Sequence, residues 1–291
     1  MMEILEILRG YLLELDAKQL LLFGLFPVFM LIAALEALHF RRTDIYKLED
    51  SFASLCLGGA YLCFELLLYA LFVWTIFDWV HQFRLMTIRI TPMSFLILYL
   101  LVDLLFYLYH FTAHKVRYFW AGHVVHHASE HMNFTTAMRQ SALYPLSFVW
   151  GFFLPLAWLG FERDWIFFAL ALNLAYQFFL HTQWINKLPG IVEFFLNTPS
   201  HHRVHHGRND IYIDRNFGGT LIIWDRIFGT FTEEKTTENP DYGITRQIYS
   251  YNPIQLTLHE WTDMFRDMSQ PGPLLLRLKH VWANPEWQRG K

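Results

Sequence analysis

The residues of this chain best suited to chemistry are its histidines, which number 15 among 291 residues and fall mostly in short clusters. Imidazole is the commonest metal ligand in proteins. Three clusters stand out by spacing: one His-x3-His, followed by two copies of His-x2-His-His. They comprise His110, His114, His123, His126, His127, His202, His205 and His206. The repetition of one spacing predicts a metal site rather than unrelated surface or core histidines.

Helical geometry explains why these spacings suit metal binding. Residues four apart on a helix project from one face on consecutive turns, so His110 and His114 can bind a single ion. In the second cluster, His123 and His127 share one face, whereas His126 points in an adjacent direction. One cluster can therefore serve two ions. His181, at the end of an apolar stretch, is a ninth candidate ligand.

The number of histidines predicts two metal ions. A structural zinc site uses four ligands, and eight or nine imidazoles fit two ions with four or five nitrogen ligands each. Imidazole binds iron, zinc, copper and nickel, so the spacing leaves the metal open. Cys56 and Cys63 lie about 10 Å apart along a helix, too far for an unstrained disulfide, and are not expected to bind metal.

The composition predicts a membrane protein, because 54% of the residues are hydrophobic and only 17% are charged. The net charge of −3 with no long basic run argues against a nucleic-acid partner. A spanning helix needs about 20 apolar residues. The stretches that qualify are 19–38, 52–77, 93–112, 142–160 and 164–182. We expect an all-α integral membrane protein with four to five membrane-embedded helices and a cytosolic, histidine-rich di-metal cap.

The segment 142–160 and the N-terminal lead have features that bear on how the chain crosses the membrane. Pro145 and Pro155 can kink the stretch 142–160, so a re-entrant hairpin that never fully spans is the alternative. The amphipathic lead over residues 1–18 lacks the features of a cleaved signal peptide, so the first helix is expected to remain in the mature protein. From about residue 183 the chain becomes polar and rich in turns, which indicates a water-facing region.

The orientation follows from the order of the helices. Parity places the loops 39–51 and 113–141 on the same side as the C-terminal region, so all histidine clusters face one water phase. The excess of Lys and Arg in these loops favours the cytoplasm. We expect three parts, which are N-terminal transmembrane helices over 1–94, a catalytic domain over 95–235 and a C-terminal cytosolic tail over 236–291.

The three histidine motifs on a chain of apolar helices resemble the fatty acid hydroxylase and sterol desaturase superfamily of membrane di-iron oxygenases. Further motifs are similar to the alkylglycerol monooxygenase family within it. These are Trp120-Ala121-Gly122-His123, Thr136-Ala137-Met138-Arg139-Gln140-Ser141, Asn197-Thr198-Pro199-Ser200 and Ile223-Trp224-Asp225-Arg226-Ile227-Phe228-Gly229. The resemblance covers about residues 95–235 and implies that the eight cluster histidines and His181 hold two irons. The chain departs from the family pattern at His131-Met132 and Gln183.

What the resemblance implies is hydroxylation of a C–H bond of a lipid by O2. The similarity to the alkylglycerol monooxygenase family implies cleavage of the ether bond of an alkylglycerol, with tetrahydrobiopterin as reductant. A sterol or fatty-acyl hydroxylase or desaturase, supplied by an external electron-transfer protein, is the alternative enzyme. A membrane metal transporter or metal-storage protein is the alternative of another class, although transport requires ligands distributed through the membrane depth.

Several polar residues are candidates to support the metal ligands. Asp103 precedes His110 by seven residues on the same helical face, and an acid inside an apolar span is costly enough to suggest a function. We expect it to orient a ligand ring, with a bond to a neighbouring Tyr or Trp as the alternative. Glu130 and Asn133 follow the second cluster and are candidates for the same role or for loop capping. Arg139, Gln140, Asn209, Asp214 and Asp225 share these two interpretations.

Overall fold

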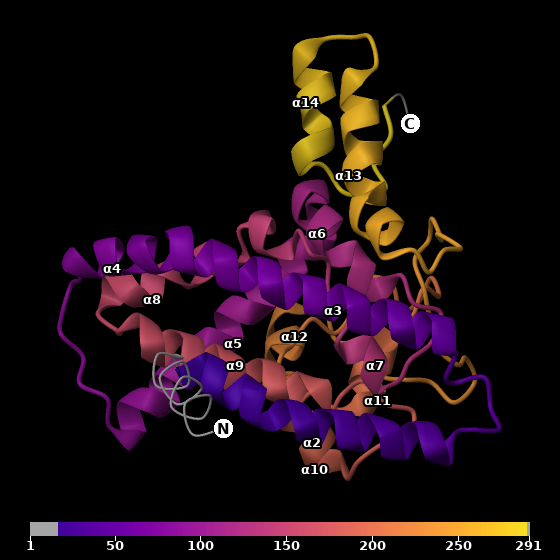
Figure 1. Ribbon diagram of the computed structural model, residues 1–291, viewed down its shortest axis with the longest axis horizontal. Coiled ribbons are helices and arrows are strands. Elements are labelled where there is room, and N and C mark those ends of the chain that lie inside the picture. Colours follow the sequence, from indigo (N-terminus) through magenta and orange to yellow (C-terminus); the bar gives the residue numbers. More distant parts are fainter. Residues whose placement is uncertain (1–16, 290–291) are drawn as a thin grey trace, which may run out of the picture.

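The computed structural model describes residues 17–289, and this part of the chain is all-α, with only isolated β-bridges (Figure 1). Long helices fill the first half: α2 (Ala17–His39), α3 (Leu48–Leu68), the π-helical turn η1 (Tyr69–Val73), α4 (Trp74–Gln82) and α5 (Pro92–Lys115). The middle of the chain holds α6 (Arg117–His127), α7 (Phe134–Ala137), the 3-10 helices η2 (Tyr144–Ser147) and η3 (Val149–Phe153), α8 (Leu154–Leu159) and α9 (Arg163–Phe178). The last part contains α10 (Gly190–Phe195), α11 (Pro199–His205), α12 (Ile223–Phe228), α13 (Pro253–Ser269) and α14 (Leu274–Trp282). The amphipathic lead lies largely outside the described residues.

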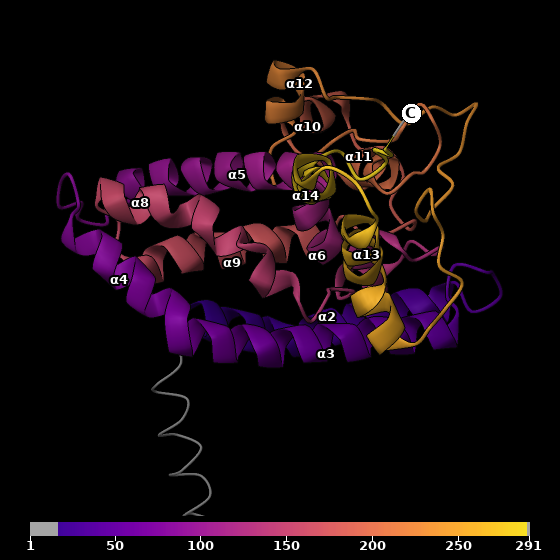
Figure 2. The ribbon, with the colours of Figure 1, turned by 90° about the horizontal axis from the view of Figure 1, so that it is seen from above.

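The long helices form stacked layers that carry the polar segments at one end. In Figure 2, α2 and α3 lie in one layer and α5 in another, with α9 between them. Helix α9 packs against both α2 and α5, which makes it the centre of the bundle. The short helices α10, α11 and α12 gather beside the C-terminal end of α5, and α13 and α14 form a projecting hairpin.

Local sequence signals explain where the central helix α5 begins and ends. Thr91 and Ser94 form a capping box at its start, and Pro92 occupies the first helical position, where no backbone N–H is needed. The chain leaves the helix at Val116, which is extended, and α6 begins at the next residue. Helix α6 then packs against α5. This sharp turn brings the first two histidine clusters together.

Among residues 17–289, two continuous helices are long and apolar enough to cross a membrane: Leu48–Gln82, with a mean hydropathy of 1.9, and Pro92–Lys115, with 1.8. Large apolar side chains remain exposed along the bundle, among them Leu31, Phe52 and Leu71. Such faces suit contact with lipid. The apolar segment Gly24–His39 is shorter. The structure therefore supports two spans, and a total of four to five stays a prediction.

The stretch 142–160 does not form the single helix that its composition suggested. It is divided into η2, η3 and α8, and Phe148 between the two 3-10 helices has a left-handed backbone with φ of 59°. Pro145 and Pro155 each lie in the first turn of a new helix, because a proline lacks the N–H needed inside one. The broken conformation agrees with the alternative of a kinked segment.

Candidate metal centre

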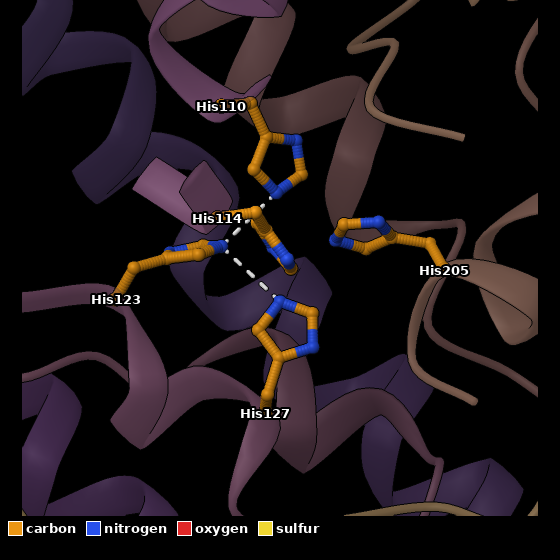
Figure 3. A group of neighbouring side chains, drawn as sticks. All are labelled: His110, His114, His123, His127 and His205. Carbon is orange, nitrogen blue, oxygen red and sulfur yellow. Dashed lines mark hydrogen bonds between the residues drawn. The ribbon is translucent and has the colours of Figure 1, made fainter. Parts of the chain in front are cut away.

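The structure brings all nine predicted histidines together in two adjoining groups. The five-histidine group contains His110, His114, His123, His127 and His205, and the four-histidine group contains His126, His181, His202 and His206. Within each group, the candidate ligand nitrogens all lie within 4.8 Å of one another. Figure 3 shows the rings of the five-histidine group converging on a common centre. The division into five and four matches the ligand count expected for two ions.

Helical register divides each His-x2-His-His motif between the two groups. On α6, His123 and His127 point into the five-histidine group, whereas His126 points into the other. The third motif shows the opposite division, because His202 and His206 belong to the four-histidine group and His205 crosses to the first. This division is compatible with the prediction that one cluster can serve two ions, which stays a prediction.

Backbone carbonyl groups fix the orientation of four of the rings. The Nδ1 atoms of His110, His126, His181 and His205 lie 2.9–3.1 Å from the carbonyl oxygens of Phe217, Arg139, Gln177 and Arg215, respectively. A carbonyl oxygen only accepts hydrogen bonds, so each Nδ1 carries the proton and each neutral ring presents an Nε2 lone pair. This tautomer leaves Nε2 free to bind a metal.

The ring nitrogens face one another in a way that favours a bound cation. The Nε2 atoms of His126 and His181 are 3.1 Å apart, although both rings have Nδ1 on a carbonyl. Two lone pairs at this distance repel, and a positive ion between them removes the repulsion. His114, His205 and His206 also have buried Nε2 atoms with no hydrogen-bond partner among the described residues. The donor set therefore fits bound metal.

Burial keeps the imidazoles uncharged. It lowers the pKa of His126 to about 4 and holds the pKa of His205 and of His206 well below the ordinary value of 6.5. The neighbouring histidines lower the pKa of His205 and His206 further, because several cations would repel one another. The rings are thus in the protonation state that metal binding requires.

Asp103 does not contact a histidine ring, and the expectation that it orients a ligand directly is wrong. Its carboxylate accepts hydrogen bonds from the backbone N–H groups of Thr220 (2.7 Å) and Leu221 (3.1 Å), and from the side chains of Asn173 (2.6 Å) and Trp224 (2.8 Å). The bond to Trp224 matches the alternative interpretation. Asp103 thus fixes the loop that carries the carbonyl group of Phe217, and it supports His110 only through this loop.

Glu130 and Asn133 also lack contact with the histidine rings. Glu130 is exposed, and its nearest ionic partner is Arg208 at 3.7 Å. Asn133 is buried as the N-cap of α7, and its amide donates to the carbonyl oxygen of Ile45 at 2.7 Å. Loop capping is therefore the better account of Asn133. Neither residue contacts the nitrogens that would hold metal.

Other polar residues after the clusters contact the ligands or the loop that holds one of them. Arg139 is buried, pairs with Asp50 at 3.1 Å and donates to the carbonyl oxygen of Val125 at 2.9 Å, while its own carbonyl receives His126. Asp214 lies 3.4 Å from Nδ1 of His114. Asp225 accepts hydrogen bonds from the N–H groups of Phe217 and Gly218, at 2.7 Å each, and so shapes the same loop as Asp103.

Some supporting residues were not identified from the sequence. Glu36 on α2 accepts from the hydroxyl of Thr182, next to His181, and from the backbone N–H of Phe134 at 2.9 Å. Asn173 bridges Asp103 and Gln177, whose carbonyl oxygen holds His181. The acid at position 36 within an apolar stretch was a usable signal. The sequence carries no signal for the carbonyl groups that accept from the histidine rings, because every residue has a backbone carbonyl group.

A small cavity of about 80 Å³ adjoins the histidine groups. Histidines of both groups line it, together with Trp120 on α6 and with charged and apolar residues of the segments that follow α11. Its lining includes His114, His127, His205, His206, Trp120, Arg208, Asp214 and Glu286. The cavity gives a small molecule a place next to the ring nitrogens.

Comparison with known proteins identifies the family. Residues 95–230 match the family model described as fatty acid hydroxylase. The chain is 42% identical over 201 residues to alkylglycerol monooxygenase of Xenopus tropicalis and 43% identical over 205 residues to that of Homo sapiens. Both alignments cover 69% of this chain but 44% of the relative, so the chain spans less than half of each of these proteins.

A more distant relative is the ornithine lipid hydroxylase OlsE of Rhizobium tropici, 27% identical over 172 residues, which are 54% of this chain and 48% of that protein. No solved structure matches the chain. All nine grouped histidines lie within the matched segment. Residues 95–230 of the chain belong to the fatty acid hydroxylase family.

Proposed function

We propose that the chain is an oxygen-dependent lipid hydroxylase that holds two iron ions in its paired histidine groups. The observation that carries this proposal is the set of nine buried imidazoles, divided into five and four, whose lone pairs face one another. Geometry alone suits several metals. The choice of iron rests on the resemblance to the di-iron oxygenases, and the choice of a lipid rests on the relatives' names.

Two bound irons would supply the activation of O2, so that one oxygen atom enters a C–H bond and the other leaves as water, with two electrons and two protons from a reductant. The protein's own contribution is positional. Carbonyl groups hold the rings of His110, His126 and His181 in one tautomer, and the buried surroundings exclude bulk water. The exposed apolar faces of α3 and α5 allow a lipid chain to approach from the apolar phase.

The substrate that we propose is an alkylglycerol ether lipid. Hydroxylation of the carbon beside the ether oxygen gives a hemiacetal, which collapses to an aldehyde and free glycerol. The similarity to two alkylglycerol monooxygenases over 69% of this chain supports this choice. A tetrahydropterin would then be the reductant, and the cavity of about 80 Å³ beside the histidine groups offers it an approach past Arg208 and Asp214.

The proposed location is a membrane, with the histidine groups on the cytoplasmic face. Two long apolar helices support membrane insertion. The loop residues Arg41, Arg42 and Lys47 support the orientation by the positive-inside rule. Residues 95–235 would form the catalytic domain, because the family match and all nine histidines lie within these bounds.

The metal content of anaerobically purified protein tests the proposal, together with O2 uptake on separate lipids. We expect about two irons per chain and O2 uptake that depends on both an alkylglycerol and a tetrahydropterin. Uptake only with a sterol, a fatty-acyl lipid or an ornithine lipid would keep the hydroxylase and reject the ether-lipid substrate. Bound metal without O2 uptake on any lipid would reject the enzyme and favour transport or storage.

Single substitutions locate the reaction at the histidine groups. His126→Ala and His205→Ala each remove a ring from one group, and both variants should lose bound iron and turnover while still inserting into the membrane. His39→Ala is the matched control, because His39 is exposed and stacks on Trp184 rather than joining either group. Full activity in both group variants would contradict the proposed site.

A further inference from the structure

The C-terminal helices enclose a second polar site that shares no residue with the histidine groups. A cavity of about 270 Å³ lies between the N-terminus of α6, the helices α13 and α14, and the segment that follows them. Its charged and titratable lining consists of Arg117, Arg246, Arg266, Asp267, His280 and Arg289. The backbone N–H of Arg117 donates to the carbonyl oxygen of Ala283 at 3.0 Å, which holds the final segment against α6.

Arg117 has a buried donor without an acceptor. The residue is only 1% exposed. Its Nε donates to Glu260 and its Nη1 to Asp267, each at 2.7 Å. Its Nη2 is buried and has no hydrogen-bond partner among the described residues. Buried polar groups are nearly always satisfied, so this atom indicates a missing acceptor.

Arg289 adds a positive charge that is not neutralised within the described part of the chain. Its guanidinium donates only to backbone carbonyl oxygens, including those of Pro271 at 2.9 Å and Asp267 at 3.3 Å. By contrast, Arg246 and Arg266 have carboxylate partners in Glu260 and Asp263. The carboxylate of Asp267 is itself bound by Arg117, so it does not leave a free negative charge in the cavity.

We propose that this cavity binds a phosphate-type oxyanion, held by Nη2 of Arg117 and the guanidinium of Arg289. Guanidinium groups match phosphate oxygens because their N–H donors lie in a plane and remain charged. The oxyanion would satisfy the buried donor and neutralise the unpaired charge together. This site is independent of the iron chemistry proposed above, because none of its residues contributes to either histidine group.

The surroundings of the cavity favour a phospholipid headgroup as the source of the oxyanion. The hairpin of α13 and α14 projects sideways from the bundle, across the direction of α3 (Figure 1). It exposes large apolar side chains beside its charged ones: Ile254, Phe265, Leu274, Leu275, Leu278 and Trp282. Amphipathic helices of this kind lie in the membrane surface, with their charged groups at headgroup level. Free phosphate from the water phase is the other source with the same chemistry.

Thermal unfolding of the full chain in detergent tests the site without relying on catalysis. The probes are inorganic phosphate and a short-chain phosphatidylglycerol, compared with sodium chloride at equal ionic strength. Both phosphate-bearing probes should raise the unfolding midpoint in proportion to their binding. Arg289→Gln should weaken binding about tenfold, which corresponds to the loss of one charge-assisted hydrogen bond. Arg277→Gln is the matched control, because Arg277 lies on α14, donates to the carbonyl oxygen of Met268 and does not line the cavity.

The results separate the source of the ligand from the existence of the site. A larger shift with the lipid than with inorganic phosphate at equal concentration identifies a headgroup, and equal shifts identify free phosphate. No shift with either probe, or the same shift in Arg289→Gln as in the unchanged chain, would overturn the proposal. If Arg289→Gln fails to fold, Arg289→Lys replaces it, because a lysine keeps the positive charge but lacks the planar set of guanidinium donors that the site requires. Binding unchanged by that variant would equally overturn the site.

Discussion

Replacing Asp103 with asparagine should destabilise the protein and release iron, although the residue does not contact a histidine. Oδ1 of Asp103 accepts from Asn173 and Thr220, and Oδ2 accepts from Leu221 and Trp224. In asparagine, an NH2 group replaces one of the two carboxylate oxygens. This NH2 group would face the two donors that the replaced oxygen had accepted from, and it cannot accept a hydrogen bond from either. The change therefore removes two hydrogen bonds to a charged group. At about 1.5–3 kcal/mol each, the free energy of unfolding should fall by about 3–6 kcal/mol.

The iron loss follows from the two routes that connect Asp103 with the histidines. The loop that it holds carries the carbonyl oxygen of Phe217, which receives His110. Its partner Asn173 accepts from Gln177, whose carbonyl oxygen receives His181. One substitution should thus loosen a ring in each group, and the iron content per folded chain should fall below two.

Chemical unfolding in detergent, followed by tryptophan fluorescence, measures the first effect, and elemental analysis of the folded fraction measures the second. Asp78→Asn is the control, because Asp78 is 56% exposed and pairs with Arg163 at the surface, where such pairs contribute less than about 1 kcal/mol. Loss of stability with two irons retained would show that Asp103 serves packing alone. An unchanged free energy of unfolding would refute the reasoning altogether.

Three further perturbations test how the histidine groups are built. Asp50→Asn removes the partner of the buried Arg139 and should cost about 3–5 kcal/mol in chemical unfolding, whereas an effect below about 1 kcal/mol would contradict the importance of this ion pair. Gly58→Ala should lower the free energy of unfolding by about 1–3 kcal/mol, because the added Cβ would lie 2.5 Å from the carbonyl oxygen of Met138. The control is the neighbouring Gly59→Ala, whose Cβ has nothing within 4 Å, so that this variant should be neutral or stabilising. Equal unfolding midpoints for the two variants would count against this close packing. Removing metal with a chelator should lower the thermal unfolding midpoint, because the facing Nε2 atoms of His126 and His181 lose the cation between them, and ferrous iron should restore it; a midpoint that chelation leaves unchanged would argue against bound metal.

Much of the fold was predictable because long apolar stretches nearly always become helices. The predicted stretch 19–38 lies within α2, and 52–77 lies within the continuous helix formed by α3, η1 and α4. The stretch 93–112 lies within α5, and 164–182 largely coincides with α9. The stretch 142–160 failed as a single helix because composition does not register local backbone breaks, such as the left-handed Phe148. The helices α13 and α14 were not predicted, because their apolar residues lie on one face and charged residues interrupt the sequence between them.

The sequence by itself determined which histidines form the site. Ligand type and helical spacing are local properties, so His110 and His114, or His123 and His127, could be paired before the fold was known. Only the tertiary structure decided that His205 crosses to join the five-histidine group and that Asp103 acts through a loop. Both facts depend on contacts between segments about 100 residues apart in the chain. Spacing along one helix carries no information about which distant backbone group lies opposite a side chain, and that is why packing had to settle them.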